Sequence, residues 1–241
     1  MKSGRLAADI KDALLAMADP DRAIQTARFF KTGPGEYGDG DVFLGISVPQ
    51  QRTLADKYKR EIDEDTVRRL LDAEYHEVRL TAVFLLNLGF QRDEQMGHGK
   101  SWVDLYLSKT HRINNWDLVD ASAHIVVGRW LEHRDRSILY KLAEADLLWD
   151  NRIAMVATLH FIRRYDVSDC LRLSEKFLSH PHDLMHKAAG WMLREAWKRK
   201  PDPVEGFLNR YADVMPRTML RYAIEKMTEP ERKAYMAKPK D

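Results

Sequence analysis

The chain has 241 residues, of which 44% are hydrophobic and 32% are charged. This amount of apolar material is sufficient for a hydrophobic core and excludes an intrinsically disordered chain. The 39 Lys and Arg residues nearly balance the 37 Asp and Glu residues, so the formal net charge is only +2. Any binding to nucleic acid would therefore have to come from a local basic patch and not from the global charge.

The single cysteine, Cys170, excludes a disulfide framework and favours a reducing cytosol. No run approaches the ~20 apolar residues of a membrane span. Asp9 and Asp12 interrupt what would be the apolar core of a signal peptide. We therefore expect a cytoplasmic protein without a membrane partner.

Helical periodicity starts near the N-terminus. Residues 5–18 place apolar side chains on one stripe, and Asp19-Pro20 supplies the N-cap and first residue of a second helix. The Gly-rich loop at 32–41 formally matches G-x-G-x-x-G. No strand precedes it and its acidic residues would repel a pyrophosphate, so we do not predict a dinucleotide site there.

Ser47-Val-Pro49 predicts the start of the next helix, with Arg52 in its first turn. An Arg beside a helix N-terminus suits a phosphate, although a solvated Arg explains it equally well. Further helices are predicted over residues 63–74, 76–90, 100–110, 115–133, 136–145, 150–165, 168–179, 182–199, 203–213 and 216–227, followed by a basic tail. No segment alternates with period two for long, which predicts an all-α chain.

Helix pairs repeat along the chain. Arg79, Trp116, Arg152 and Lys187 follow one another at intervals of 37, 36 and 35 residues. A two-helix unit of ~35–47 residues is typical of HEAT-like α-solenoids, in which second helices line one concave wall. We predict a single HEAT-like repeat domain over residues 1–241. Its concave side would be formed by residues 115–133, 150–165 and 182–199.

Trp116 and Asp120 lie four residues apart, on one face of a helix that Asn114 or Asn115 would cap. Alone, the pair fits a core tryptophan beside a capping or ion-paired carboxylate. The repeat, however, places Arg152 and Trp191 on the neighbouring second helices. Side chains this large and polar are unusual where repeat helices pack, so a functional groove is predicted.

The residue types in this groove indicate a chemistry. Indole faces favour a flat cationic ligand, and an Arg suits a phosphate. A carboxylate such as Asp120 can stabilise an oxocarbenium-like sugar and direct water to it. Together these features describe a site for an alkylated purine in DNA. The cations from Lys187 to Lys200, including Arg194, would follow the phosphates, although a solvated helix face explains such runs more often.

Four motifs carry a resemblance to a known family: Phe43-Leu-Gly-Ile46 with Pro49-x-x-Arg52, Asn115-Trp-Asp-Leu-Val-Asp120, Asn151-Arg-Ile-Ala, and Lys187-Ala-Ala-Gly-Trp191-x-Leu-Arg-Glu195. Over about residues 20–230 the chain resembles the DNA alkylation repair glycosylases with HEAT-like repeats, the AlkD type. The resemblance implies an enzyme of base excision repair that removes N3- and N7-alkylpurines from duplex DNA and grips the lesion through the backbone. It implies no metal and no cofactor.

Matched by position, the resemblance implies the catalytic carboxylate at Asp120, the paired tryptophans at Trp116 and Trp191, and the active-site Arg at Arg152. Arg52 matches a DNA-contacting Arg. The Gly-rich loop departs from the shorter version in some members, so no residue is carried over there.

Other interpretations of the groove and of several residues stay open. A non-catalytic HEAT-like scaffold could bind a protein or damaged DNA in the same groove, and Asp120 discriminates, because a pure DNA binder gains nothing from a carboxylate facing phosphates. His182 and His186 have metal-ligand spacing but lack a Cys or a second acidic ligand, so we expect surface or interface histidines. Lys187 could form a Schiff base, but a phosphate contact and a monofunctional, monomeric enzyme are expected. Trp102, Trp130, Trp149 and Trp197 are assigned to packing.

Overall fold

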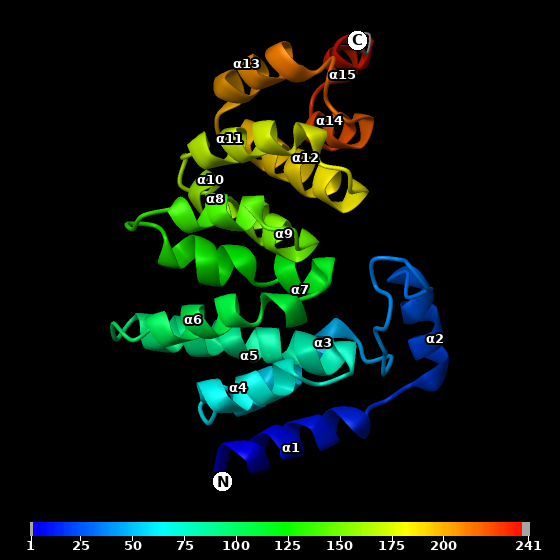
Figure 1. Cartoon of the computed structure of the whole chain (residues 1–241), viewed down its shortest axis with the longest axis vertical. Coiled ribbons are helices and arrows are strands. Elements are labelled where there is room, and N and C mark those ends of the chain that lie inside the picture. Colours follow the sequence, from blue (N-terminus) through cyan, green and yellow to red (C-terminus); the bar gives the residue numbers. More distant parts are fainter. Residues whose placement is uncertain (1, 238–241) are drawn as a thin grey trace. The chain divides into compact units, whose positions relative to one another are not determined.

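The computed structural model describes residues 2–237, which form helices joined by loops that are short except for the segment 30–47 (Figure 1). Contacts within the chain divide it into two compact units, Met1–Ser122 and Ala123–Asp241. Within residues 2–237 the β-structure is limited to one isolated bridge between Val42 and Tyr75. The predicted all-α class is confirmed, and helix pairs stack within each unit as in an α-solenoid.

The first unit is organised around α5, which is buried along most of its length and contacts α3, α4, α6 and α7. Its middle part, residues 80–90, is mainly apolar and suits this central place, whereas its first turn buries His76, Glu77 and Arg79. The elements of this unit are α1 Lys2–Leu15, α2 Pro20–Phe29, α3 Val48–Tyr58, α4 Glu64–Leu71, α5 His76–Glu94, α6 Lys100–Ser108, the 3₁₀ turn Thr110–Arg112 and α7 Trp116–Asp120.

Local capping explains where several of these helices begin. The side chain of Asp19 accepts from the backbone N–H of Arg22 at 3.1 Å, and Ser47 forms a capping box with Gln50. Asn115 accepts from the N–H of Trp116 at 2.8 Å. These side chains satisfy backbone donors that have no partner within the helix. The predicted starts at Asp19, Ser47 and Asn115 are confirmed.

The second unit is organised around α12, which contacts α9, α11, α13 and α14. Arg152 and Lys187 are the fifth residues of α9 and α12, so the 35-residue spacing reflects one register in two stacked helices. The elements are a π-helical segment His124–Gly128, α8 Ser137–Glu144, α9 Leu148–Ala157, α10 Leu159–Ile162, α11 Ser168–Lys176, the 3₁₀ turn Phe177–Ser179, α12 Asp183–Trp197, α13 Pro201–Tyr211, α14 Arg217–Ala223 and α15 Glu229–Met236.

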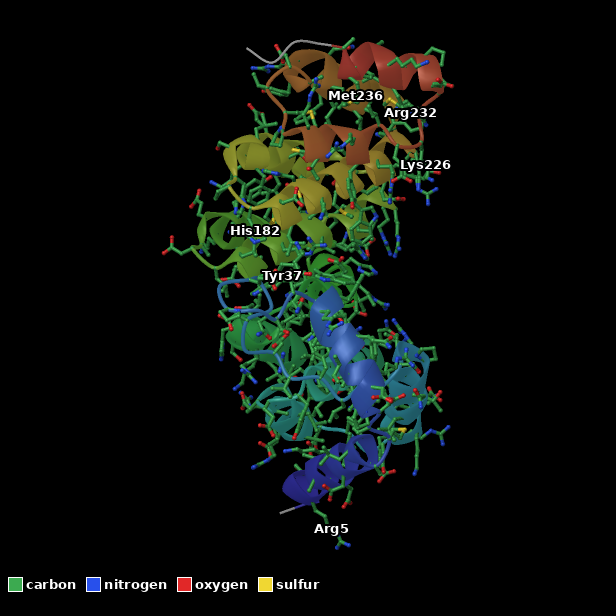
Figure 2. The ribbon with its side chains drawn as sticks, turned by 90° about the vertical axis from the view of Figure 1, so that its right-hand side faces the viewer. Arg5, Tyr37, His182, Lys226, Arg232 and Met236 are labelled. Atoms are coloured by element: carbon green, nitrogen blue, oxygen red, sulfur yellow. The ribbon has the colours of Figure 1, made fainter. Side chains whose placement is uncertain are left out.

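Three sequence predictions about helices are wrong. The helix expected over 150–165 is divided at Thr158 into α9 and α10. The helix expected over 115–133 is interrupted by a turn at 121–122 and then continues with a π-helical segment. The expected basic tail instead contains α15, which Thr228 and Glu231 start with a capping box. Figure 2 labels Arg232 and Met236 on this last helix. A reciprocal cap satisfies two orphan donors and so supports a helix that buries none of its residues.

Two glycines allow helices of the second unit to touch through their backbones. A Cβ added at Gly128 would lie 2.4 Å from the carbonyl oxygen of Ala157, and one at Gly190 would lie 2.4 Å from that of Met219. In both cases the facing carbonyl is 29 residues further along the chain. The same close approach is therefore made twice in the stack.

We expect Gly190→Ala to destabilise the protein by roughly 1–3 kcal/mol, because overpacking forces the helices apart. Gly206 in α13 is the matched control, since a Cβ there would meet nothing within 4 Å. Gly206→Ala should stabilise by about 0.5–1 kcal/mol, because Ala restricts the unfolded chain and suits a helix. Urea unfolding of both variants measures the difference. Equal effects would show that the α12–α14 contact does not restrict residue 190.

The cysteine and the four tryptophans assigned to packing differ in how far their side chains are buried. Cys170 is buried in α11 with 1% exposure, and burial raises the pKa of its thiol to about 12. Trp102 is fully buried and donates Nε1–H to Asp93 at 2.7 Å, and Trp149 is 6% exposed. Trp130 and Trp197 are half-buried.

None of the helices within residues 2–237 has the length and hydropathy needed to span a membrane.

Candidate functional site

The predicted site residues fall in both units. Trp116, Asp120 and Arg52 belong to the first, and Arg152, Lys187, Trp191 and Arg194 belong to the second.

The start of α7 is fixed by Asn115. This side chain is fully buried, caps Trp116, and donates Nδ2–H to Asp41 Oδ2 at 3.1 Å. Trp116 is the first residue of α7 and Asp120 is its last, and both side chains are half-buried. Anchoring the cap therefore fixes the helix turn that carries the predicted indole and carboxylate.

The indole of Trp116 is held in an aromatic column. It stacks on Phe30 with ring centroids 5.1 Å apart and planes 9° apart, and Phe30 in turn stacks on Phe43 at 5.1 Å. Phe29 meets Trp116 edge to face at 6.1 Å. Stacked and edge-to-face pairs each contribute about 0.5–1.5 kcal/mol beyond their buried area. The end of α2 therefore sets the orientation of the indole.

A buried network of charged side chains adjoins this aromatic column, because the ring of His76 packs against Phe30 and Phe43. His76 contacts Asp41 through Nδ1 at 3.1 Å and Asp117 through Nε2 at 2.8 Å, and Arg79 donates to Asp41 at 2.5 Å. Burial opposes a charge on His76, but the carboxylates of Asp117 and Asp41 prevail and raise its pKa to about 9. Burial also acts to raise the pKa of Asp41, yet His76 and Arg79 hold it below the usual range. At neutral pH the imidazole is a cation.

This network predicts a pH dependence of stability. The pKa of His76 is about 9 in the folded chain against an ordinary value of 6.5. Its stabilising contribution is therefore complete below pH 6.5 and is lost as the pH rises through 9. The loss should reach about 3 kcal/mol, because one pKa unit corresponds to about 1.4 kcal/mol. Urea unfolding across this pH range measures it. In His76→Gln the dependence should be flatter, and an unchanged slope would contradict the assignment.

Arg152 is more enclosed than the sequence suggested. It is 5% exposed, and its Nη1 donates to the carbonyl oxygen of Leu184 at 2.6 Å. This bond links α9 to the first turn of α12. The guanidinium thus takes part in the packing of two stacked helices, whatever else it contacts.

Lys187, Trp191 and Arg194 follow one another along α12 at helical spacing. Lys187 pairs with Asp183 at 2.8 Å, and Arg194 pairs with Glu225 and, at 3.4 Å, with Glu195. Trp191, which lies between Lys187 and Arg194 in the sequence, has a half-buried side chain. These carboxylates offset much of the local positive charge that the sequence indicated.

Arg52 is exposed near the start of α3, with its guanidinium 4.2 Å from the centre of the Phe84 ring. A cation over an aromatic face is oriented while its outer N–H groups stay in water. Of the predicted DNA contacts, this side chain is the most accessible.

The histidines beside Arg152 mainly serve the helix start. The Nδ1 of His182 accepts from the N–H of Leu184 at 3.1 Å, and His186 donates Nε2–H to the carbonyl of His180 at 2.6 Å. Among residues 2–237 there is no group of three His, Cys, Asp or Glu side chains placed to hold a metal ion.

The comparison with known proteins decides the family. A family model described as DNA alkylation repair enzyme matches residues 10–227. The chain belongs to this family. A solved structure of a predicted DNA alkylation repair enzyme from Enterococcus faecalis resembles this member with a TM-score of 0.67 at 19% identity, covering 88% of this chain and 97% of that one. At this identity the likeness shows the fold alone. No curated protein matches the chain.

Sequence reasoning missed the ionic network of this DNA alkylation repair protein. Asp117 lies within the motif that carries Trp116 and Asp120, which was the available signal. Asp41 and His76 carry no such signal, and Arg79 was marked only by the repeat. The meeting of the three side chains depends on the path of the Gly-rich loop against α5.

Proposed function

We propose that this family member is a monofunctional DNA glycosylase that excises N3- and N7-alkylpurines from duplex DNA in base excision repair. Membership of the DNA alkylation repair family supports a role in repairing alkylation damage. The observation that carries the proposal is the placement of Trp116 and Asp120 at the two ends of α7, with the indole fixed against Phe30.

Alkylation at N3 or N7 makes the purine cationic, so the base leaves as a neutral molecule when the N-glycosidic bond breaks. The sugar then develops oxocarbenium character. The carboxylate of Asp120 stabilises this charge and directs water to the sugar carbon. Trp116 and Trp191 present indole faces to the cationic base, which attract it more than a neutral one. This chemistry requires no cofactor.

The DNA backbone is proposed to lie against Arg52, Lys187, Arg194 and Arg152. Arg52 is exposed and can meet a phosphate without rearrangement. Lys187 and Arg194 would exchange Asp183 and Glu225 for phosphates. Arg152 is assigned to the backbone because it matches the active-site Arg of the family motif. We assign Lys187 to a phosphate contact and not to a Schiff base, which keeps the enzyme monofunctional.

The test is incubation of the protein with methylated duplex DNA and chromatography of the released bases. We expect release of 7-methylguanine and 3-methyladenine, with the strand cleaved only after alkali treatment. Tight binding of methylated duplex without any release would favour the alternative, a non-catalytic HEAT-like scaffold. Strand cleavage without alkali would contradict the monofunctional assignment.

A further inference from the structure

The first unit contains a cleft between α2, the start of α3, and the first turns of α5 and α7. Its volume is about 320 Å³, which is within the range of small-molecule sites. One wall is aromatic and consists of Phe29, Phe30 and Phe43. Two of these rings, Phe29 and Phe30, also contact Trp116. The cleft therefore adjoins the indole assigned to the lesion.

Phe29 is unusual in this wall. It is 67% exposed, on a helix none of whose residues is buried. Figure 2 looks onto this helix, the blue ribbon at the front. A large aromatic side chain left this accessible beside a cleft offers a surface on which a flat ring can stack, and such stacking contributes to base binding in many nucleic-acid proteins.

Polar groups line the rest of the cleft. Arg22 and Gln25 are exposed on α2, and Gln25 offers both a donor and an acceptor. The carboxylate of Asp117 accepts from His76 and from the N–H of Leu118. A carboxylate has about four acceptor positions, so Asp117 can also accept from a ligand.

We propose that this cleft binds a flat heteroaromatic base of purine size and retains the alkylpurine after excision. The purine would stack on Phe29, donate N–H groups to Asp117, and bond through its ring nitrogens and carbonyl with Gln25 and Arg22. A phosphate fits less well, because the carboxylates of Asp117 and Glu77 both line the cleft. The choice of an alkylpurine rests on the proposed glycosylase function, whereas the stacking site does not.

The experiment is equilibrium dialysis of free 7-methylguanine against the whole protein. Saturable binding is expected for the wild type, and 5,6-dihydrouracil, which has amide groups but no aromatic ring, should not bind. Phe29→Leu keeps an apolar side chain without a ring and should weaken binding roughly 5- to 100-fold. Phe29→Tyr should retain it. Ile24→Ala is the control, because Ile24 is 56% exposed on the same helix and does not line the cleft.

Absence of saturable binding by the wild type, or equal binding by Phe29→Leu, would overturn the proposal. Equal binding of dihydrouracil would do the same, since it would remove the need for stacking. Excision from methylated duplex DNA is measured separately. Binding of 7-methylguanine without excision would contradict the proposed glycosylase function and support the base-binding cleft. Excision without binding would support the glycosylase function and contradict the base-binding cleft.

Discussion

Replacing Asp120 with Asn is expected to lower the rate of alkylpurine excision by roughly 100- to 1,000-fold, the usual effect of losing one main electrostatic stabiliser. The substitution keeps the size of the side chain and removes the charge that would face the oxocarbenium-like sugar. Binding of methylated duplex should be retained or become slightly tighter, because a carboxylate near phosphates opposes binding. Single-turnover excision and a binding titration measure the two effects.

The tryptophans provide a contrast within the same experiment. Trp116→Ala and Trp191→Ala should reduce excision mainly for cationic lesions, since an indole face attracts a charged base more than a neutral one. Asp120→Asn should reduce it for every substrate. Circular dichroism confirms that each variant is folded. Wild-type excision by Asp120→Asn would remove the catalytic assignment and leave the scaffold hypothesis.

The largest expected loss of stability is at Glu77. Its side chain is buried and accepts from the backbone N–H groups of Leu44 at 2.8 Å, Gly45 at 2.8 Å and Ile46 at 3.3 Å. Glu77→Ala would leave three buried donors without a partner. At about 1–3 kcal/mol for each of the three unsatisfied donors, the free energy of unfolding should fall by roughly 3–9 kcal/mol.

Glu77→Gln is the graded variant. Its single carbonyl oxygen can replace Oε1, which accepts from Gly45 and Ile46, but its NH₂ group would face the N–H of Leu44. An intermediate loss is expected in urea unfolding. Glu74→Ala, at an exposed position three residues earlier, should change stability by less than about 0.5 kcal/mol. A loss at Glu77→Ala as small as this control would contradict the assigned role.

The bonds to Glu77 also explain the motif Phe43-Leu-Gly-Ile46. Gly45 has a φ of +81°, and a Cβ there would lie 2.2 Å from the carbonyl oxygen of Asp19. Only glycine adopts this conformation readily and also permits that contact. The sequence marked the segment through its resemblance to a family, but the carboxylate that holds it lies about thirty residues away, and no local pattern assigns it this role.

Helix starts were predictable because capping is local. Asp19, Ser47 and Asn115 each lie within three residues of the donor that they satisfy. The interruption after Asp120 was not predictable in this way. The carbonyl oxygen of Ala121 accepts from the side chain of Asn87 at 2.9 Å, a contact 34 residues away in sequence. Periodicity within one helix carries no information about such a partner.

The candidate site was predictable to the same degree. The motif identified Trp116 and Asp120 as a pair on one helix, which the structure confirms as to placement. The enclosure of Arg152 depends on α12 stacking over α9, and the charge of His76 depends on two carboxylates from distant segments. The enclosure of Arg152 and the charge of His76 both depend on contacts with residues far away in the sequence. The local sequence pattern does not indicate such contacts.

The burial of Cys170 predicts that the native protein reacts very slowly with thiol reagents. With a pKa of about 12 and 1% exposure, its sulfur carries almost no thiolate at neutral pH and is reached only when α11 opens. The rate at which a maleimide modifies the chain would therefore report opening of the second unit. A cysteine introduced at an exposed position would, in turn, be modified selectively while the protein stays folded, so spectroscopic probes can be attached without first removing the natural thiol.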